Sequence, residues 1–395
     1  MFKHQTRMAA GLLSFLTAMV LTIPAYSCTT VFWSNPISKV TARTMDLFVS
    51  DDPLIKVEPR GMMRTGDAGK HSLKWRSKYG SVVVTAFHSN AASDGMNEKG
   101  LAVHLLYLGS TQYGKNSGNK PEIANLLLGQ YVLDNFSTVD AALNAIKKVH
   151  VVAIEEHGQK WPIHFMLQDN TGDSAVVEYV KGQLRIYHGP QYDVMTNEPP
   201  YNIQLANLKR YKAFGGDLPL PGNASPLSRF VRVASYLKTL PKPKNQAEAV
   251  AYILSDIRTA MVPFGATIES TGEKIEDNWP TRWVSVADLT NKVYYFSSTM
   301  MPSIIWIDLK KINFSQQFPL RTTSWIKMLR SKQVRACTQG REPRLSPLRI
   351  PHRGLCNSKP EWLNFSKNKS VLEIDPINIH LEGDVTSKLA PSYQG

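Results

Sequence analysis

The chain has 395 residues, of which 43% are hydrophobic and 20% are charged. These fractions are typical of a globular protein with a sizeable core, built as one large domain or two ordinary ones. Basic residues outnumber acidic ones by 46 − 32 = 14. Segment 321–360 holds ten basic residues and one acid, so 10 − 1 = 9 of the surplus charges lie there. The rest of the chain is only mildly basic, and we expect no nucleic acid as a partner of the main domain.

The first 27 residues have the three parts of a secretory signal peptide. Lys3 and Arg7 form a basic start, and residues 8–23 are mostly apolar. Residues 24–27 place small side chains at the third and first positions before a cut. We therefore expect cleavage directly before Cys28 and export to the periplasm or the extracellular space.

Two other interpretations of this segment stay open. An uncleaved membrane anchor is less favoured because the apolar run is short for a bilayer span and Pro24 follows it at once. A lipoprotein acylated at Cys28 is less favoured because Ala25 and Tyr26 make a poor lipid-attachment sequence. Cleavage that leaves Cys28 as the first residue is the leading hypothesis.

Hydrophobic periodicity after Cys28 predicts strands, then helices, more strands, a further helix and a last set of strands. Asn35-Pro36 and residues 289–291 are expected to form turns, and residues 94–100 a turn-rich loop. The strands are predicted at residues 29–33, 39–43, 82–86, 101–108, 164–167, 174–179, 184–187, 283–288 and 292–297.

Three helices are predicted between these strands. One spans residues 122–133, and a second is opened by Ser137 with Asp140 three residues later, which is a capping-box pattern. A third begins at Asn245, with Glu248 at the matching position, and runs to about residue 259. This order is typical of an α+β fold in which mixed sheets are covered by helices, rather than of a simple βαβ repeat.

Residues 316–362 interrupt this pattern. The segment is basic, rich in Pro, Gly and Ser, and flanked by the near-repeats 312–315 and 363–366. We interpret it as a disordered insertion in a surface loop of a single domain that spans residues 28–395. The alternative is a folded extension closed by a disulfide between its two cysteines.

The chain has three cysteines, Cys28, Cys337 and Cys356. The last two lie within the insertion and could pair, which would leave Cys28 as a free thiol in an exported protein. A cysteine that begins a mature chain carries both a thiol and an α-amine, whose reference pKa of about 8 suits a base near neutral pH. Cys28 could otherwise be a buried thiol or half of a disulfide.

Along the chain, seven short motifs occur in this order: Cys28-Thr29-Thr30, Arg43-Thr44-Met45-Asp46, Asn97-Glu98-Lys99-Gly100-Leu101, Thr196-Asn197-Glu198-Pro199-Pro200-Tyr201, Leu227-Ser228-Arg229-Phe230-Val231-Arg232, Trp283-Val284-Ser285-Val286-Ala287-Asp288 and Gly383-Asp384-Val385-Thr386. Together they resemble the choloylglycine hydrolase family, which includes bile salt hydrolases and penicillin V acylases. The resemblance covers residue 28 to about residue 310 and resumes near residue 367. It implies an N-terminal-nucleophile hydrolase with a four-layer αββα sandwich, which acts on non-peptide linear amides without metal or cofactor and tends to form homotetramers.

Carried over on that resemblance, Cys28 is the nucleophile and its freed α-amine is the base. Arg43 would lie near the thiol and favour its ionised form, and Asp46 would hold the α-amine in place. Asn197 would donate an N–H to the oxyanion of the tetrahedral intermediate, typically worth ~3 kcal/mol of barrier. Arg229 would complete the charged network. Taken singly, the favoured interpretations would be a surface ion pair for Arg43 and Asp46, a turn cap for Asn197 and a solvated side chain for Arg229.

Three further residues are candidates for the oxyanion hole and the substrate pocket. Tyr107 stands where bile salt hydrolases typically carry asparagine, which is more similar to penicillin V acylases, and its backbone N–H could serve the oxyanion hole. Trp33 and Phe87 are candidate walls for an aromatic or long acyl group, although plain core packing explains them at least as well.

The resemblance therefore implies an exported cysteine amidohydrolase that cleaves the amide between an apolar acyl group and an amine, as in penicillin V or a conjugated bile salt. Two alternatives stay open: an acyl-homoserine lactone acylase of the same family, and a non-catalytic, lipid-anchored binding protein acylated at Cys28. A small-molecule amide is the expected partner. Contact of the basic insertion with an anionic membrane is less favoured.

Overall fold

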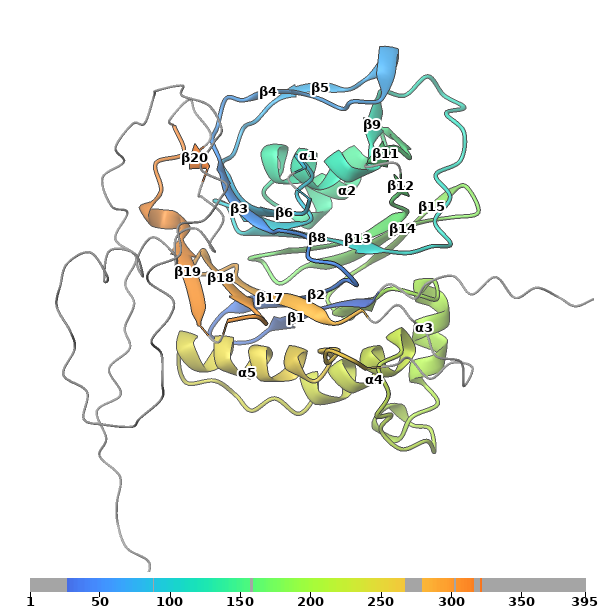
Figure 1. The fold of residues 1–395 in the computed structure, drawn as a ribbon, viewed down its shortest axis with the longest axis vertical. Helices are drawn as coiled ribbons and strands as arrows, with labels where there is room; N and C mark the ends of the chain where they lie inside the picture. The colour runs from blue at the N-terminus through green and yellow to red at the C-terminus, as the bar shows by residue number, and fades with distance from the viewer. Residues whose placement is uncertain are drawn as a thin grey trace, which may run out of the picture.

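The computed structural model describes residues 27–87, 89–156, 159–266, 279–301, 303–315 and 320–321. They form four layers, in which two β-sheets pack face to face and helices cover the outer face of each (Figure 1). This is the predicted α+β fold, an αββα sandwich. The predicted signal peptide apart from Ser27, nearly all of the predicted insertion and both of its cysteines lie outside the described residues. In the described part of the chain, no helix is long and apolar enough to cross a membrane.

The six-stranded sheet contains Cys28, and its strands are antiparallel throughout. In spatial order its strands are β16 (Val194–Thr196), β1 (Ser27–Ser34), β2 (Lys39–Asp46), β17 (Thr281–Asp288), β18 (Val293–Ser298) and β19 (Ile304–Asp308).

The second sheet has eight strands, which are also antiparallel. Their spatial order is β15 (Gln183–His188), β14 (Ser174–Val180), β13 (Ile163–Asp169), β8 (Leu101–Tyr107), β7 (Asp94–Asn97), β6 (Ser81–Thr85), β3 (Leu54–Glu58) and β20 (Leu320–Arg321). Three two-stranded ribbons are formed by β4 (Met63–Thr65) with β5 (Lys74–Arg76), β9 (Glu122–Ala124) with β10 (His150–Val152), and β11 (Glu155–Glu156) with β12 (Gln159–Lys160).

Helices α1 and α2 cover the eight-stranded sheet, and α4 and α5 cover the six-stranded sheet (Figure 1). The helices are α1 (Leu128–Asn135), α2 (Val139–Ile146), α3 (Tyr201–Leu208), α4 (Pro226–Leu237) and α5 (Gln246–Arg258). Short 3-10 turns occupy Gly69–His71, Asn125–Leu127, Lys212–Phe214 and Leu309–Lys311.

Two apolar cores follow from this layering. The larger fills the space between the sheets and continues under α4 and α5, with Phe32, Trp283 and Phe230 among its buried side chains. The smaller lies between the eight-stranded sheet and α1 and α2. Because inner strands are covered on both faces, β13 is buried along its whole length. Such strands have little hydrophobic alternation, which limits what a sequence pattern can show about their two faces.

Several local predictions were wrong. The helix predicted at residues 122–133 begins only at Leu128, because residues 122–124 pair with β10 as strand β9. Residues 94–97 form strand β7 rather than a loop. Helix α2 is capped by Thr138 instead of Ser137, since the Thr138 hydroxyl accepts the N–H of Ala141 at 3.3 Å.

Helix α5 begins as predicted. The side chain of Asn245 accepts the N–H of Glu248 at 2.9 Å, and the Glu248 carboxylate accepts the N–H of Lys244 at 2.8 Å. Helices α3 and α4 were not predicted. For α4 a start signal was present, because Ser225 is its N-cap and Pro226 occupies its first turn.

Candidate active site

Cys28 is the second residue of β1, the strand between β16 and β2. In the register of β1 with β2, Cys28 lies opposite Met45, and Thr30 lies opposite Arg43. Directly paired residues project from the same face of a sheet, and so do residues two apart. The Cys28 thiol, Met45 and Arg43 therefore share the face toward the eight-stranded sheet.

The thiol sits in a nearly buried position, with 5% of Cys28 exposed. Its Sγ lies 3.9 Å from Sδ of Met45, and Nη2 of Arg43 lies 3.2 Å from the same Met45 sulfur. Burial raises the pKa of the Cys28 thiol, whereas the Arg43 guanidinium and the backbone N–H of Asp46 act to lower it. Because the pKa lies above its usual value, a base must remove the thiol proton before Cys28 can attack.

The other face of the same strands carries a buried ion pair. Oδ2 of Asp46 lies 3.7 Å from Nη1 of Arg229 on α4, and both side chains are fully buried. Asp46 also accepts hydrogen bonds from the hydroxyls of Thr281 at 2.6 Å and Thr44 at 3.3 Å. Burial raises the pKa of Asp46 to about 7, against the lowering effect of Arg229. The carboxyl group of Asp46 can therefore gain or lose a proton near neutral pH.

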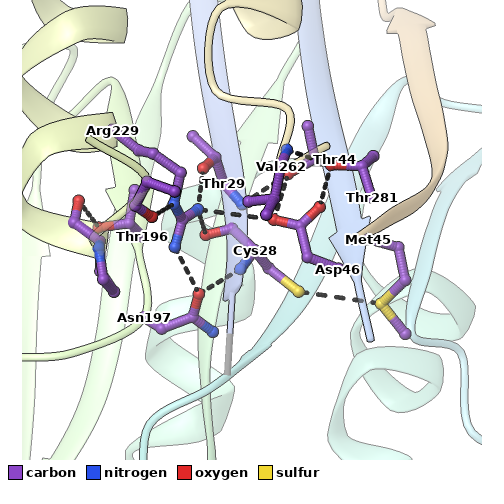
Figure 2. A network of polar contacts seen from close by, with 12 residues as sticks. Cys28, Thr29, Thr44, Met45, Asp46, Thr196, Asn197, Arg229, Val262 and Thr281 are labelled. Atoms are coloured by element: carbon purple, nitrogen blue, oxygen red, sulfur yellow. Dashed lines mark hydrogen bonds and ion pairs between the residues drawn. The ribbon is translucent and has the colours of Figure 1, made fainter. Parts of the chain in front are cut away.

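Arg229 and Asn197 hold the backbone of Cys28 from two sides (Figure 2). Nη1 of Arg229 donates to the carbonyl of Cys28 at 2.8 Å and to the hydroxyl of Thr29. Oδ1 of Asn197 accepts the backbone N–H of Cys28, and Nη2 of Arg229 donates to it at 3.4 Å. Nδ2 of Asn197 donates to the carbonyl of Tyr107 at 2.8 Å. These partners fix which end of the Asn197 amide faces Cys28.

Cys28 and the four polar residues expected around it thus meet at one place, although they come from three separate parts of the chain. β1 and β2 contribute the thiol and its two charged neighbours, the segment after β16 contributes an amide, and α4 contributes a second arginine. In chain order they are Cys28, Arg43, Asp46, Asn197 and Arg229.

A pocket of about 90 Å³ lies beside Cys28. Its walls are mostly apolar, and two aromatic rings, Phe87 and Trp161, stand 5.5 Å apart between centroids. Phe87 has φ +53°, a region that bulky residues rarely adopt, and its N–H donates to the carbonyl of Asp51 at 2.6 Å. Besides Cys28 and the β2 residues Arg43, Met45 and Asp46, the lining residues are Leu47, Ala86, Phe87, Ser89, Ala91, Ser93, Leu105, Tyr107, Leu126, Trp161 and Ile163.

Two of the three predicted pocket residues, Tyr107 and Phe87, line this pocket, and Trp33 does not. Trp33 follows Cys28 by five positions, so the alternation of β1 puts its side chain on the opposite face. There its ring centroid lies 6.5 Å from that of Tyr252 on α5. No sequence pattern indicated Trp161, which directly follows strand β12 and reaches the pocket only through the fold.

In the part of the chain that the structure describes, no group of three or more His, Cys, Asp or Glu side chains is placed to hold a metal ion. The arrangement around Cys28 instead combines a thiol, hydrogen-bond donors and fixed charges at the edge of an apolar pocket. These are the parts that acyl transfer through a covalent intermediate requires.

Residues 28–322 match the family model described as linear amide C-N hydrolases, choloylglycine hydrolase family. A penicillin V acylase of Pectobacterium atrosepticum is 37% identical over 303 residues, which cover 71% of this chain and 80% of that protein. A bile salt hydrolase/transferase of Clostridium perfringens is 30% identical over 304 residues, which cover 69% of this chain and 88% of that protein.

Solved structures of a penicillin V acylase and a bile acid hydrolase are also similar to this chain. The penicillin V acylase from Agrobacterium tumefaciens superposes with a TM-score of 0.66 at 38% identity, over 74% of this chain and 89% of that one. A variant of the conjugated bile acid hydrolase from Clostridium perfringens superposes with a TM-score of 0.64 at 25% identity, over 75% of this chain and 97% of that one.

Proposed function

Because the chain belongs to the choloylglycine hydrolase family of linear amide C–N hydrolases, we propose that Cys28 is its N-terminal nucleophile and that it cleaves an amide between an apolar acyl group and an amine. The observation that carries the proposal is the position of Cys28. Its backbone nitrogen contacts Asn197, its carbonyl contacts Arg229, and its thiol faces Arg43 and the pocket. Cleavage before Cys28 would turn that backbone nitrogen into an α-amine beside the thiol.

In the proposed reaction, the α-amine takes the thiol proton, and the thiolate attacks the carbonyl carbon of the amide. When the tetrahedral intermediate collapses, the ammonium returns its proton to the leaving nitrogen, the C–N bond breaks and the free amine departs. The acyl group stays on Cys28 as a thioester. Water then attacks the thioester, the α-amine takes a proton from that water, and the carboxylic acid leaves as the thiol is restored.

Asn197 is the best-placed donor for the oxyanion of this intermediate. One N–H of its Nδ2 is used by the Tyr107 carbonyl, which orients the amide and leaves the second N–H for the substrate oxygen. The backbone N–H of Tyr107 is the second proposed donor. A carboxylate oxygen of Glu198 accepts the N–H of Ser110 at 3.1 Å, so the segments that carry the two donors are tied together.

Of the two substrate types in the family, penicillin V is better supported for this chain than a conjugated bile salt. The acylases from Pectobacterium and Agrobacterium are 37% and 38% identical to this chain, against 30% for the bile salt hydrolase/transferase sequence and 25% for the bile acid hydrolase structure from Clostridium perfringens. Phe87, Trp161 and Tyr107 supply an aromatic lining that suits a flat phenoxyacetyl group. We also propose export and signal-peptide cleavage, since the mechanism needs a free α-amine on Cys28.

Mass and activity of the mature protein test this proposal together. We expect an intact mass that begins at Cys28 without lipid, hydrolysis of penicillin V, and loss of at least about 100-fold in kcat for Cys28→Ser. The Cys337→Ser/Cys356→Ser double variant is the matched control and should retain activity. Full activity of Cys28→Ser, or a mature chain that begins elsewhere, would refute the assignment of Cys28 as the N-terminal nucleophile. A lipid on Cys28 would support the binding-protein alternative.

A panel of amides defines the acyl specificity. Penicillin V, glycine- and taurine-conjugated bile salts and acyl-homoserine lactones each contain a linear amide but differ in both the acyl group and the amine. We expect the highest kcat/KM for penicillin V. A higher value for an acyl-homoserine lactone would instead support the acyl-homoserine lactone acylase alternative.

A further inference from the structure

We infer that Asp94, supported by His104, is a positioning residue that orients the Arg43 guanidinium toward the Cys28 thiol; this inference rests on the proposed role of Cys28. Asp94 on β7 and His104 on β8 belong to the sheet opposite Cys28, and neither lines the pocket. They reach the site through a polar cluster that crosses the space between the sheets. The cluster consists of Arg43, Asp94, His104, Ser285 and Tyr294.

The cluster is embedded in apolar surroundings. Arg43 lies opposite Ser285 in the register of β2 with β17, and Tyr294 projects beside them from β18 toward Asp94. Burying this many polar groups costs free energy unless they are paired with one another. The inter-sheet core in which these polar groups lie includes Phe32, Met96, Ala102, Leu106, Trp283 and Phe296.

Arg43 is held between an anchor and the thiol. Its guanidinium carbon lies 5.2 Å from the centroid of the Trp283 ring. Nη1 donates to the carbonyl of Ser93 and lies 3.5 Å from Oδ2 of Asp94, whereas Nη2 lies 3.2 Å from the sulfur of Met45, the neighbour of Cys28. Among the described residues, Asp94 is the only carboxylate within 4.0 Å of an Arg43 nitrogen.

Asp94 is itself fixed by several donors. It accepts hydrogen bonds from the Tyr294 hydroxyl, from the Ser285 hydroxyl at 3.3 Å and from Nδ1 of His104 at 2.7 Å. Burial acts to raise the pKa of Asp94, but His104 and Arg43 outweigh it and hold the pKa below its usual value. The Asp94 carboxylate is therefore held in one orientation, as a group that positions a guanidinium must be.

His104 completes the support. Its Nε2 lies 3.0 Å from the hydroxyl of Thr41, and that hydroxyl also donates to the carbonyl of Val31 at 3.0 Å. Its Nδ1 lies on the Asp94 carboxylate, so the imidazole links Asp94 to the Thr41 hydroxyl on β2 and limits how the carboxylate can turn.

This arrangement keeps the positive charge of Arg43 next to the thiol. An opposite charge within about 4–6 Å typically shifts a pKa by about 1–3 units. Without its anchor, the guanidinium can turn into the pocket, where it is solvated and no longer favours the thiolate. By element, the charged and titratable groups that face Cys28 or Arg43 are Asp46 on β2, Asp51 after β2, Asp94 on β7, Tyr294 on β18 and Arg229 on α4.

Alkylation of Cys28 by iodoacetamide, followed by peptide mass spectrometry as a function of pH, tests the inference on the mature protein. Arg43→Met, which removes the cation, is expected to move the midpoint of the rate profile upward by about one pH unit or more. Asp94→Asn should move it in the same direction by about half a unit. In Asp94→Asn, kcat for amide hydrolysis should fall about tenfold, and KM should change by less than about threefold.

Asp134→Asn is the matched control, because Asp134 is another fully buried carboxylate, 2.9 Å from Nε of Arg64 and remote from Cys28. It should leave the alkylation midpoint unchanged. His104→Gln is a milder second variant, and a smaller upward shift is expected for it. If Asp94→Asn folds, as judged by circular dichroism, an unchanged or lower midpoint overturns the inference. If it does not fold, an unchanged midpoint in His104→Gln does so.

The alkylation rate does not depend on amide turnover. A failure of this inference is therefore distinguishable from a failure of the proposed function, which would appear as an active Cys28→Ser variant or a different N-terminus.

Discussion

The two faces of β1 and β2 divide the chemistry of the site residue by residue. Cys28 and Arg43 project toward the eight-stranded sheet and the pocket, whereas Thr29 and Arg229 meet on the side of α4. Asp46, at the end of β2, bonds to residues of the helical side and also lines the pocket. The backbone of Cys28 lies between the two sets of groups, so one residue can present its thiol to one set and its nitrogen to the other.

At this scale we predict that Trp161 contributes to acyl-group selection. Trp161→Ala removes the ring opposite Phe87, and we expect KM for penicillin V to rise about tenfold with a smaller change in kcat, because the lost contact is made in both ground and transition states. Steady-state kinetics measure this. Trp33→Ala is the control, since Trp33 packs against Tyr252 outside the pocket. An equal rise in KM for both variants would contradict the assignment.

Helix α4 is the element that brings Arg229 to Cys28. The carbonyl of Ser225 accepts the backbone N–H of Arg229 at 2.9 Å, and the Ser225 hydroxyl accepts the N–H of Ser228 at 3.3 Å. Arg229 thus lies in the first turn of a capped helix, where the backbone position depends on the cap. Helix α5, capped in the same way by Asn245, packs beside it without carrying any of the five polar site residues.

The two caps allow a matched prediction. Ser225→Ala and Asn245→Ala should each lower the free energy of unfolding by about 1 kcal/mol, measured by denaturant titration. Only Ser225→Ala should also lower kcat, by about threefold to tenfold, because Arg229 shifts with the first turn of α4. Equal kcat values in the two variants would show that the position of Arg229 does not depend on its cap.

At the scale of the whole molecule, the layer between α5 and the six-stranded sheet contains a buried carboxyl group that is costly to ionise. Asp256 on α5 is 1% exposed, and neither of its carboxylate oxygens has a hydrogen-bond partner in the part of the chain that the structure describes. Burial, and then repulsion from Asp193, raises the pKa of Asp256 to about 8. Burial raises the pKa of Asp193 to about 7.

These shifts predict how stability changes with pH. The native state favours the protonated acids, whereas in the unfolded chain they ionise near pH ~4. Between these pH values the native state binds more protons at these sites, so the contribution of these acids to stability should be greatest at about pH 4 and fall as pH rises to about 8. Asp46, with a pKa of about 7, acts in the same direction.

Comparison with a variant isolates the contribution of Asp256. Asp256→Asn cannot ionise, so its melting temperature should exceed that of the wild type at pH ~8 and depend less on pH. Thermal melts between pH ~5 and ~8 measure this, with the exposed Asp217→Asn as the control that should leave the slope unchanged. A lower melting temperature of Asp256→Asn at pH ~8 would indicate a partner for the ionised carboxylate.

The sequence by itself determined the parts that depend on local pattern and short motifs. Strand alternation located β1 and β2, Asn245 and Glu248 located the start of α5, and ordered motifs indicated the family, Cys28 and the four polar residues around it. The strands and the helix start have a local physical cause in period and capping, whereas the site residues were carried over from the family resemblance of motifs spread along the chain.

Only the tertiary structure decided which side chains meet. It placed Trp161 in the pocket and Trp33 outside it, and it revealed that Asp94 and His104 reach across to Arg43 from the other sheet. Contacts between sheets join residues far apart in the chain, and no local periodicity specifies them. Strands buried on both faces also lose the alternation that would show which face a residue takes, so the choice is made by packing.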